Sequence, residues 1–278
     1  MLRIPRRIKS FSGVQRGEVA SVQISGGPTL HEIALETNIL PQHILRASLI
    51  LNGDTIIEMT GEQMKMLERY KKQYEQAGMF ILPIADISGR SLEGQAETAL
   101  VTFPTDNITL EVAIAPEPDP QNPLVSPSLR ADALVSAASD ERVIIPRVRT
   151  VTFSPDSTGE NIMNTLPRGP ELRRMHLRNS DGGSPAECGI DFLRILRDRL
   201  TVYELSAHRN EFELKRRERA PQDLYFHFDP IASGFNRMDK FRTASDELEF
   251  KLDMNNTNVV QILLETVERA AQPSAGAA

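Results

Sequence analysis

The chain has 278 residues, of which 40% are hydrophobic and 25% charged, a globular composition that excludes a disordered chain. This length is enough for one large domain or two ordinary ones. The formal net charge of −6 argues against a general nucleic-acid binder, so we expect no direct sequence-specific contact with nucleic acid. The single cysteine, Cys188, excludes an intramolecular disulfide and is interpreted as a structural or incidental thiol in a reducing cytoplasm. No apolar stretch approaches the roughly 18–20 residues that span a bilayer, and the N-terminus lacks the apolar region of a secretory signal.

One ordered series of short motifs occurs twice. Ile-Pro-Arg begins at Ile4 and again at Ile145. Phe-Ser, Gly-Glu and Gly-Pro-x-Leu follow in the same order with one constant offset, at Phe11 and Phe153, Gly17 and Gly159, and Gly27 and Gly169. Farther on, residues 53–72 align with residues 198–217, and each segment precedes a strand-like run, MFILPIAD or LYFHFDP. The order of these matches predicts that the chain contains one structural unit twice.

Strict alternation of apolar and polar residues predicts half-buried strands in both halves. The apolar positions of these strands are Ala20, Val22 and Ile24; Ala47, Leu49 and Leu51; Ile108, Leu110, Val112 and Ile114; and Leu248, Phe250, Leu252 and Met254. Turn sequences such as SGGP, LNGD and DPIASG separate the runs. Many short strands at such spacing indicate an all-β sandwich or barrel.

Two short helices are expected among the strands. Residues 62–76 place Gln63, Leu67, Tyr70 and Tyr74 on one helical face. The matching segment, residues 210–219, is shorter and ends before Pro221. The basic clusters RYKK and ELKRRER at the ends of these segments are interpreted as solvated or inter-subunit faces, because they lack interleaved aromatic residues beyond Tyr70 and Tyr74.

The expected domain boundaries follow from the repeat and from a proline-rich stretch. Five prolines lie between Pro116 and Pro127, which favours an extended connector. We therefore expect a first unit over residues 1–115, a linker over 116–140 with a short helix after Pro127, and a second unit over 141–270. Residues 271–278 are expected to form a flexible tail.

The chain offers no recognisable catalytic, cofactor or metal motif, so we expect none of these sites. The five histidines include no His-x-His pair, which a metal-binding bicupin requires. His227 and Asp229 share a strand face and could hold a metal together, but a third ligand is lacking, which favours a histidine on a polar face. Nucleophile-elbow and phosphate-loop sequences are also missing.

The repeated order of short strands, LNGDTIIEM, a Lys/Arg-rich helix and an aromatic strand resembles the double jelly-roll major capsid proteins, and the corticovirus type in particular. Residues 164–179 look like the start of that family's second roll, and residues 246–268 look like its closing strand pair. The resemblance implies two tandem jelly-roll β-sandwiches with short helices in loops. It also implies a structural protein, not an enzyme.

Further expectations about assembly come from the same resemblance. It implies pseudo-hexagonal homotrimers in the icosahedral shell of a bacteriophage, over an internal lipid membrane. The implied partners are other copies of the chain, vertex or spike proteins and minor membrane proteins, and the implied location is the virion after synthesis in the host cytoplasm. The sequence leaves the closing strand of the first roll open, because the stretch after Ile114 does not copy VVQILLETVE.

Two other functions remain open at this level. A tandem β-sandwich could bind a ligand such as carbohydrate, although the chain has no Trp and only four Tyr for an exposed platform. A bicupin-like metalloenzyme is the third alternative. Separately, the first ten residues carry four positive charges and no acidic residue, at Arg3, Arg6, Arg7 and Lys9. We interpret them as a basic arm, either simply solvated or lying against anionic membrane head groups.

Overall fold

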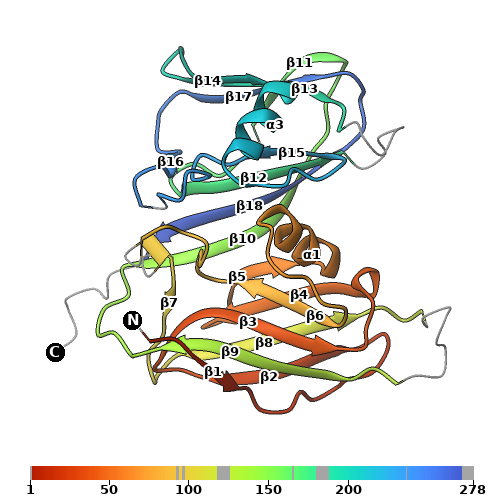
Figure 1. The fold of residues 1–278 in the computed structure, drawn as a ribbon, viewed down its shortest axis with the longest axis vertical. Coiled ribbons are helices and arrows are strands. Elements are labelled where there is room, and N and C mark those ends of the chain that lie inside the picture. Colours follow the sequence, from red (N-terminus) through yellow and green to blue (C-terminus); the bar gives the residue numbers. More distant parts are fainter. Residues whose placement is uncertain are drawn as a thin grey trace. The chain divides into compact units, whose positions relative to one another are not determined.

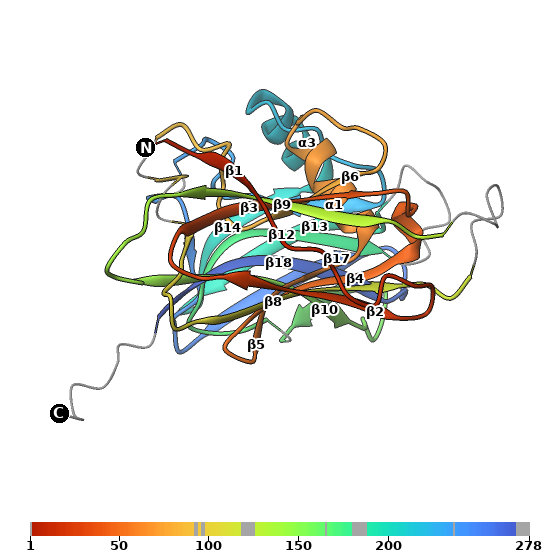
Figure 2. The same cartoon turned by 90° about the horizontal axis from the view of Figure 1, so that it is seen from below.

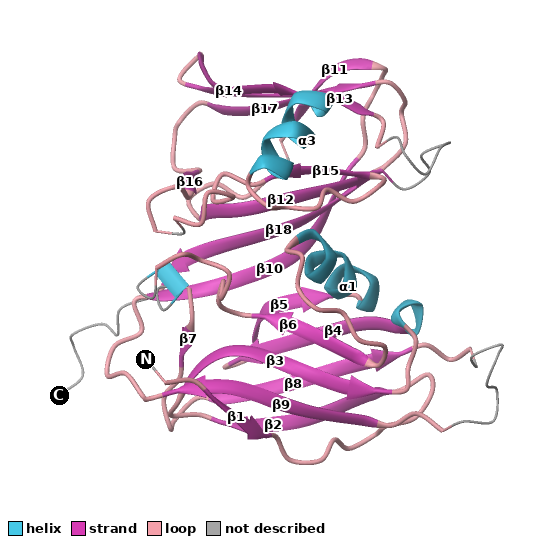
Figure 3. Ribbon diagram, in the orientation of Figure 1, coloured by secondary structure: helices cyan, strands magenta, loops and turns pink. Residues whose placement is uncertain are grey.

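The computed structural model describes residues 2–91, 94–95, 98–117, 126–164, 166–179, 188–235 and 237–270 (Figure 1). The chain divides into two compact units. Unit 1 contains the residues up to Gly61, the segment Gly78–Arg147 and the described residues from Val267 onward. Unit 2 contains the segments Glu62–Ala77 and Val148–Thr266. Both units are built mainly of antiparallel strands, with few helices among them (Figure 3).

Unit 1 is a sandwich of two antiparallel sheets. The first sheet has the order β1 (Ile4–Arg7), β9 (Leu129–Ser136), β3 (Thr29–Thr37) and β6 (Met79–Pro83), with β7 (Leu100–Val101) also paired to β3. The second has the order β5 (Asp54–Met59), β4 (Ile44–Leu51), β8 (Asn107–Ile114) and β2 (Val19–Ser25), and η1 (Pro41–His43) precedes β4. Figure 2 shows these as two layers, with β3 and β9 in one and β2 and β8 in the other.

The core of unit 1 comes from the alternating strands that the sequence predicts. In β8, Ile108, Leu110, Val112 and Ile114 are all buried, and the residues between them are partly exposed. The predicted apolar faces of β2 and β4 are buried as well. Each strand therefore contributes one apolar face to the space between the sheets, which is the main source of stability for a sandwich.

Unit 2 has the same construction. Its first sheet has the order β15 (Tyr225–Phe228), β12 (Glu171–Asn179), β18 (Val260–Arg269) and β10 (Ile144–Phe153), with β16 (Phe241–Arg242) paired to β12. Its second has the order β11 (Gly159–Met163), β17 (Leu248–Met254), β13 (Ile190–Arg197) and β14 (Leu200–Ser206). Aliphatic and aromatic side chains of both sheets form one core, which includes Leu177, Leu193, Phe228 and Leu252.

The two units repeat the same strand order, which confirms the duplication that the motifs predict. The order β1-β9-β3-β6 corresponds to β10-β18-β12-β15, and β5-β4-β8-β2 corresponds to β14-β13-β17-β11. The Ile-Pro-Arg motif lies on β1 and β10, and each of these strands pairs with the last strand of its half, β9 or β18. Gly27 and Gly169 precede the equivalent strands β3 and β12.

Strand β9 corrects two expectations. Residues 128–140 were expected to contain a short helix within a linker that extends from residue 116 to residue 140. They instead contain a strand that pairs with both β1 and β3. The reason is period-two patterning, because Leu129, Ala131, Ala133 and Val135 are buried and alternate with more polar or less buried positions. This strand closes the first roll, the element that the sequence left open.

Residues 118–125, within the expected linker, and residues 271–278, the expected tail, lie outside the described residues. The extended linker centre and the flexible tail therefore stay predictions from the sequence.

The first helix, α1 (Gly61–Tyr70), is shorter than the predicted 62–76. Lys72 has a left-handed backbone conformation with φ of 53°, which stops the helix. Gln63, Leu67 and Tyr70 are buried as the helical face predicts, whereas Tyr74 lies beyond the helix and is 87% exposed.

The second helix, α3 (Ala207–Arg216), starts three residues earlier than predicted, where Ser206 accepts a hydrogen bond from the backbone N–H of Arg209. No helix in the described part of the chain is long and apolar enough to cross a membrane.

Candidate functional site

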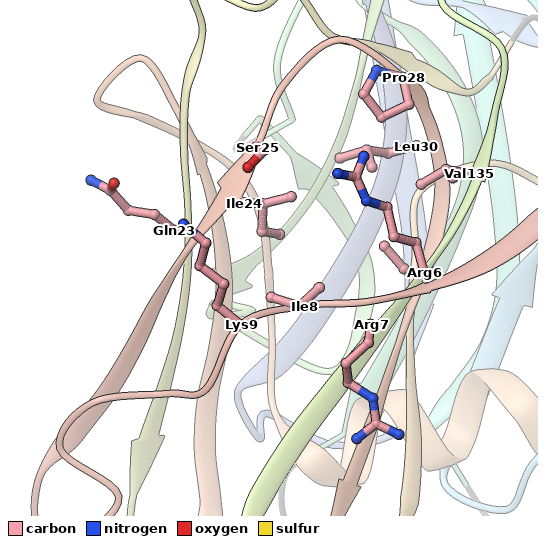
Figure 4. A pocket seen from close by; sticks show the side chains of 11 residues that line it. Arg6, Arg7, Ile8, Lys9, Gln23, Ile24, Ser25, Pro28, Leu30 and Val135 are labelled. Atoms are coloured by element: carbon pink, nitrogen blue, oxygen red, sulfur yellow. The ribbon is translucent and has the colours of Figure 1, made fainter.

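Two groupings of charged residues stand out, one in each unit. In unit 1, a pocket of about 240 Å³ lies beside the basic N-terminal segment. Its walls come from β1, β2, β3 and β9 and from the residues that follow β1 and precede β3, and Figure 4 shows the side chains that line it. The lining residues are Arg6, Arg7, Ile8, Lys9, Gln23, Ile24, Ser25, Pro28, Leu30, Ala133 and Val135.

The position of this pocket follows from the sheet order. β1 is the end strand of one sheet of unit 1, and β2 is the end strand of the other. The pocket lies between these two edges, where the described residues provide no further strand to close the sandwich. Its apolar side chains therefore belong to the core. Its charged side chains lie on residues 4–9, which comprise β1 and the two residues after it and are called the β1 segment below.

Only some of the basic residues singled out in the sequence line this pocket. Arg6, Arg7 and Lys9 line the pocket, but Arg3 does not. The Arg3 guanidinium instead donates a hydrogen bond to the side-chain carbonyl oxygen of Gln95, at 2.5 Å. The segment expected as a basic arm is partly a strand in the structure, because residues 4–7 form β1, which pairs residue by residue with β9. Backbone pairing holds the segment on the sandwich and fixes where its charges point.

In unit 2, ionisable side chains form a buried network between β12, β15, β18 and the segment that contains α1. The members of this network are Tyr70, Lys71, Arg173, Arg174, His176, Arg219, His227, Asp229 and Glu265, and all of them are buried. The register between β12 and β15 places His176 directly opposite His227. Tyr70 comes from the first half of the sequence but lies in unit 2 with the rest.

Two carboxylates accept most of the charge-assisted hydrogen bonds of this network. Asp229 Oδ2 accepts from the Tyr70 hydroxyl at 2.9 Å and from Arg174 Nε at 3.1 Å. Glu265 Oε2 accepts from Arg174 Nη1 at 3.1 Å. Arg174 therefore links both carboxylates. Burial alone would raise the pKa of Glu265, but the charges of Lys71 and Arg174 outweigh it and hold that pKa well below its ordinary value.

The hydrogen bonds of the two histidines determine their tautomers. The backbone N–H of Gln222 donates to Nε2 of His227 at 3.0 Å, so the proton of His227 is on Nδ1. His227 Nδ1 then donates to His176 Nδ1 at 2.7 Å, and His176 Nε2 donates to Glu265 Oε1 at 3.2 Å. Each ring carries one proton in this chain of hydrogen bonds. Burial lowers the pKa of both histidines, most strongly that of His227, which keeps the rings neutral.

The network differs from the polar-face interpretation of His227. The ring is buried and contacts the Tyr70 ring at a centroid distance of 4.4 Å. Lys71 and Arg219, which belong to the predicted solvated clusters, are buried as well. A sequence signal for this site does exist: β12 carries Arg173, Arg174 and His176 in a strand that the structure buries almost throughout. Buried charge in a sheet strand requires partners, and those partners are distant in sequence.

Comparison with known proteins identifies the family. The model of the viral coat protein P2 N-terminal domain matches residues 5–136, and that of the viral coat protein P2 C-terminal domain matches residues 145–270. The chain belongs to the viral coat protein P2 family. No curated protein sequence matches this coat protein significantly.

Solved structures agree on the fold. The major capsid protein P2 from bacteriophage PM2 superposes with a TM-score of 0.83 at 17% identity, covering 99% of this chain and 100% of that chain. The STIV MCP gives a TM-score of 0.67 at 14% identity, with 96% and 97% covered. The PBCV-1 protein VP54 gives 0.64 at 8% identity, with 98% and 97% covered. The double jelly-roll fold and the corticovirus-like resemblance are thereby confirmed, and the protein is a viral capsid protein.

Membership of this family decides between the functions that the sequence left open. The family supports a coat function over the carbohydrate-binding module and the bicupin-like enzyme. Within the described residues, no group of three or more His, Cys, Asp and Glu side chains is placed to hold a metal ion. Burial raises the pKa of the Cys188 thiol, which makes its reactive thiolate form scarce at neutral pH. The unit 2 network is buried, whereas the unit 1 pocket is lined in part by the exposed side chains of Arg6, Arg7 and Lys9.

Proposed function

We propose that this coat protein assembles as a homotrimer whose six jelly rolls form a pseudo-hexagonal block. Such blocks tile an icosahedral shell that encloses a lipid membrane, with the β1 segment facing that membrane. The observation that carries the trimer is the repeated strand order. Two similar units in each chain and a threefold axis give six similar modules around a ring.

Exposed apolar side chains on edge strands support lateral contacts between chains. β14 and β11 are the two end strands of one sheet in unit 2. Leu200 and Val202 on β14 are 72% and 45% exposed, and Ile162 on β11 is 53% exposed. Apolar side chains on an unpaired edge promote association with another chain, which a lattice-forming protein uses and a monomer avoids.

The charge of the N-terminal segment supports its orientation toward the membrane. Arg6, Arg7 and Lys9 are exposed, on a chain with a net charge of −6. Each basic residue near an anionic bilayer surface contributes about 1 kcal/mol of attraction at physiological salt. Repetition across a trimer multiplies this attraction through avidity. Minor membrane proteins and vertex or spike proteins complete the proposed set of partners, and the chain reaches the virion after synthesis in the host cytoplasm.

Light scattering coupled to size-exclusion chromatography tests the trimer. We expect the purified protein at micromolar concentration to have three times the chain mass of 31.0 kDa. A mass of 31.0 kDa at every concentration would contradict the trimer.

Co-sedimentation with anionic vesicles tests the orientation separately. Replacing Arg3, Arg6, Arg7 and Lys9 with Gln should leave the oligomer intact and weaken vesicle binding, with the wild-type binding falling as salt rises. Equal binding by wild type and variant at low and moderate salt would show that the segment does not provide the contact.

A further inference from the structure

We infer that the unit 1 pocket is a binding site for one anionic lipid. Its acyl chain enters the apolar interior of the pocket, and its phosphate is held by Arg6 and Lys9. The inference rests on the proposed membrane-facing orientation of the β1 segment and deepens it, because it names the ligand and the residues that select it.

The interior of the pocket is apolar and reaches into the sandwich core. Ile8, Ile24, Leu30, Ala133 and Val135 are each at most 9% exposed, yet all of them line the cavity. Next to these five side chains, methylene groups are favoured over water, because the side chains offer water no hydrogen bonds. Gln23 and Ser25 line the polar part of the pocket. The volume of about 240 Å³ is below that of drug-sized pockets, so it accommodates part of one acyl chain, not a whole lipid.

The opening of the pocket carries positive charge. Figure 4 shows Arg6 and Lys9 extending from the β1 segment to the side where Ile24 lies, whereas Arg7 extends away from Arg6. Arg7 is neutralised by Asp132, with Nε and Oδ1 at 2.7 Å. Arg6 and Lys9 make no ion pair with any residue in the described ranges. Their guanidinium and ammonium groups are therefore available to the oxygens of a phosphate.

The second half of the chain shows how differently the same motif is used there. The arginine of the repeated Ile-Pro-Arg motif is Arg147, which makes ion pairs with Asp54 at 2.6 Å and with Glu268 at 2.5 Å. Its charge is therefore already compensated by these two carboxylates. At this position of the motif, the first copy thus has an arginine without an ion pair in the described ranges, Arg6, and it adjoins an apolar cavity.

Together, these features select an amphiphilic anion. A free phosphate would use the charged opening but leave the apolar interior empty. A neutral acyl chain would use the interior but leave Arg6 and Lys9 without a partner. A phospholipid with a net negative headgroup matches both parts, and charge complementarity makes it the preferred occupant.

Isothermal titration calorimetry with dihexanoyl phosphatidate, as dispersed monomers, tests the site on the intact protein. Dihexanoyl phosphatidylcholine and inorganic phosphate serve as comparison ligands. We expect the phosphatidate to bind at least tenfold more tightly than either. Equal affinity for inorganic phosphate would overturn the lipid assignment and leave a simple anion site.

Matched variants locate the binding within the pocket. Arg6→Gln with Lys9→Gln should weaken phosphatidate binding at least tenfold. The control Arg130→Gln with Arg149→Gln removes two exposed arginines outside the pocket and should leave the affinity unchanged. Ala133→Leu fills the apolar interior with every charge kept, and should also weaken binding at least tenfold. If either pocket variant binds like wild type while its unfolding temperature is unchanged, the proposed site is wrong.

Vesicles of phosphatidylglycerol and phosphatidylcholine distinguish this inference from the proposed function. Vesicle binding that Ala133→Leu leaves unchanged would keep the membrane contact and overturn the lipid pocket. Binding of monomeric phosphatidate without any vesicle binding would support the pocket and overturn the membrane-facing orientation.

Discussion

At the scale of single residues, the buried carboxylates of the unit 2 network depend on the hydrogen-bond donors and positive charges around them. A buried carboxylate is costly to bring out of water, and Asp229 recovers that cost only through the groups that donate to it. Burial raises the pKa of the Tyr70 hydroxyl well above its ordinary value, so the group keeps its proton and remains a donor. Removing the Tyr70 hydroxyl would leave the buried Asp229 carboxylate in place with one hydrogen bond fewer.

Replacing Tyr70 with Phe should therefore destabilise the protein by about 1–3 kcal/mol, the usual cost of leaving a buried charged partner without one hydrogen bond. Urea unfolding followed by circular dichroism measures the change. Tyr74→Phe is the matched control, because Tyr74 is 87% exposed, and should change stability by less than about 0.5 kcal/mol. Similar effects at both positions would show that the Tyr70–Asp229 hydrogen bond does not contribute.

The buried histidines predict that acid destabilises the fold. Burial and the nearby charge of Arg3 lower the pKa of His31 from 6.5 to about 4. The unfolded chain thus takes up this proton near pH 6.5, whereas the folded protein takes it up only near pH 4. The contribution to stability is complete above pH 6.5 and is lost as pH falls through this window. The lowered pKa values of His176 and His227 act in the same direction.

Urea titrations at pH 7.5 and pH 5 measure this loss, and we expect lower stability at pH 5. His31→Gln keeps a polar side chain near Ser136, to which His31 Nε2 lies at 2.8 Å, and removes the titrating group. This variant should show a smaller loss between the two pH values than wild type. An unchanged loss would show that His31 does not titrate in this range.

At the scale of elements, α1 connects the two halves of the sequence. It follows β5 of the first half, yet it belongs to unit 2. Its contacts there include Gln63 Nε2 donating to Thr150 Oγ1 at 2.9 Å, and the backbone N–H of Ala220 donating to the carbonyl oxygen of Tyr70 at 2.9 Å. The second half of the chain alone lacks this helix.

A fragment of residues 138–278 should therefore fail to unfold cooperatively in urea. It leaves Asp229 without Tyr70 and Glu265 without Lys71, in addition to the lost apolar contacts of Met64 and Leu67. Addition of a peptide covering residues 61–77 should restore part of the cooperativity. A fragment that unfolds as sharply as the full chain would contradict the assignment of α1 to unit 2.

The sequence predicts the strands in which apolar and polar residues alternate regularly. β8 and β17 alternate regularly, because one face meets the core and the other does not. Residues 128–140 were expected to contain a short helix, but pairing of residues 129–136 with β1 and β3 makes this segment a strand. The end of α1 depends on the left-handed backbone at Lys72, which no pattern of apolar residues indicates.

The candidate sites were less predictable than the fold. The basic residues near the N-terminus were visible as a cluster, but the pocket beside them also needs Ala133 and Val135 from a strand more than a hundred residues away. The unit 2 network joins Tyr70, His176, His227 and Glu265 through strand register. Single-sequence patterns carry no information on such distant pairings.

At the scale of the whole molecule, we propose that each chain supplies two jelly rolls to a pseudo-hexagonal block. Electron cryo-microscopy of the purified oligomer tests this most directly. We expect a threefold-symmetric particle in which each chain contributes two β-sandwiches, so that six similar densities surround the axis. A monomer, a dimer or a ring in which the sandwiches of each chain do not both reach the perimeter would contradict it.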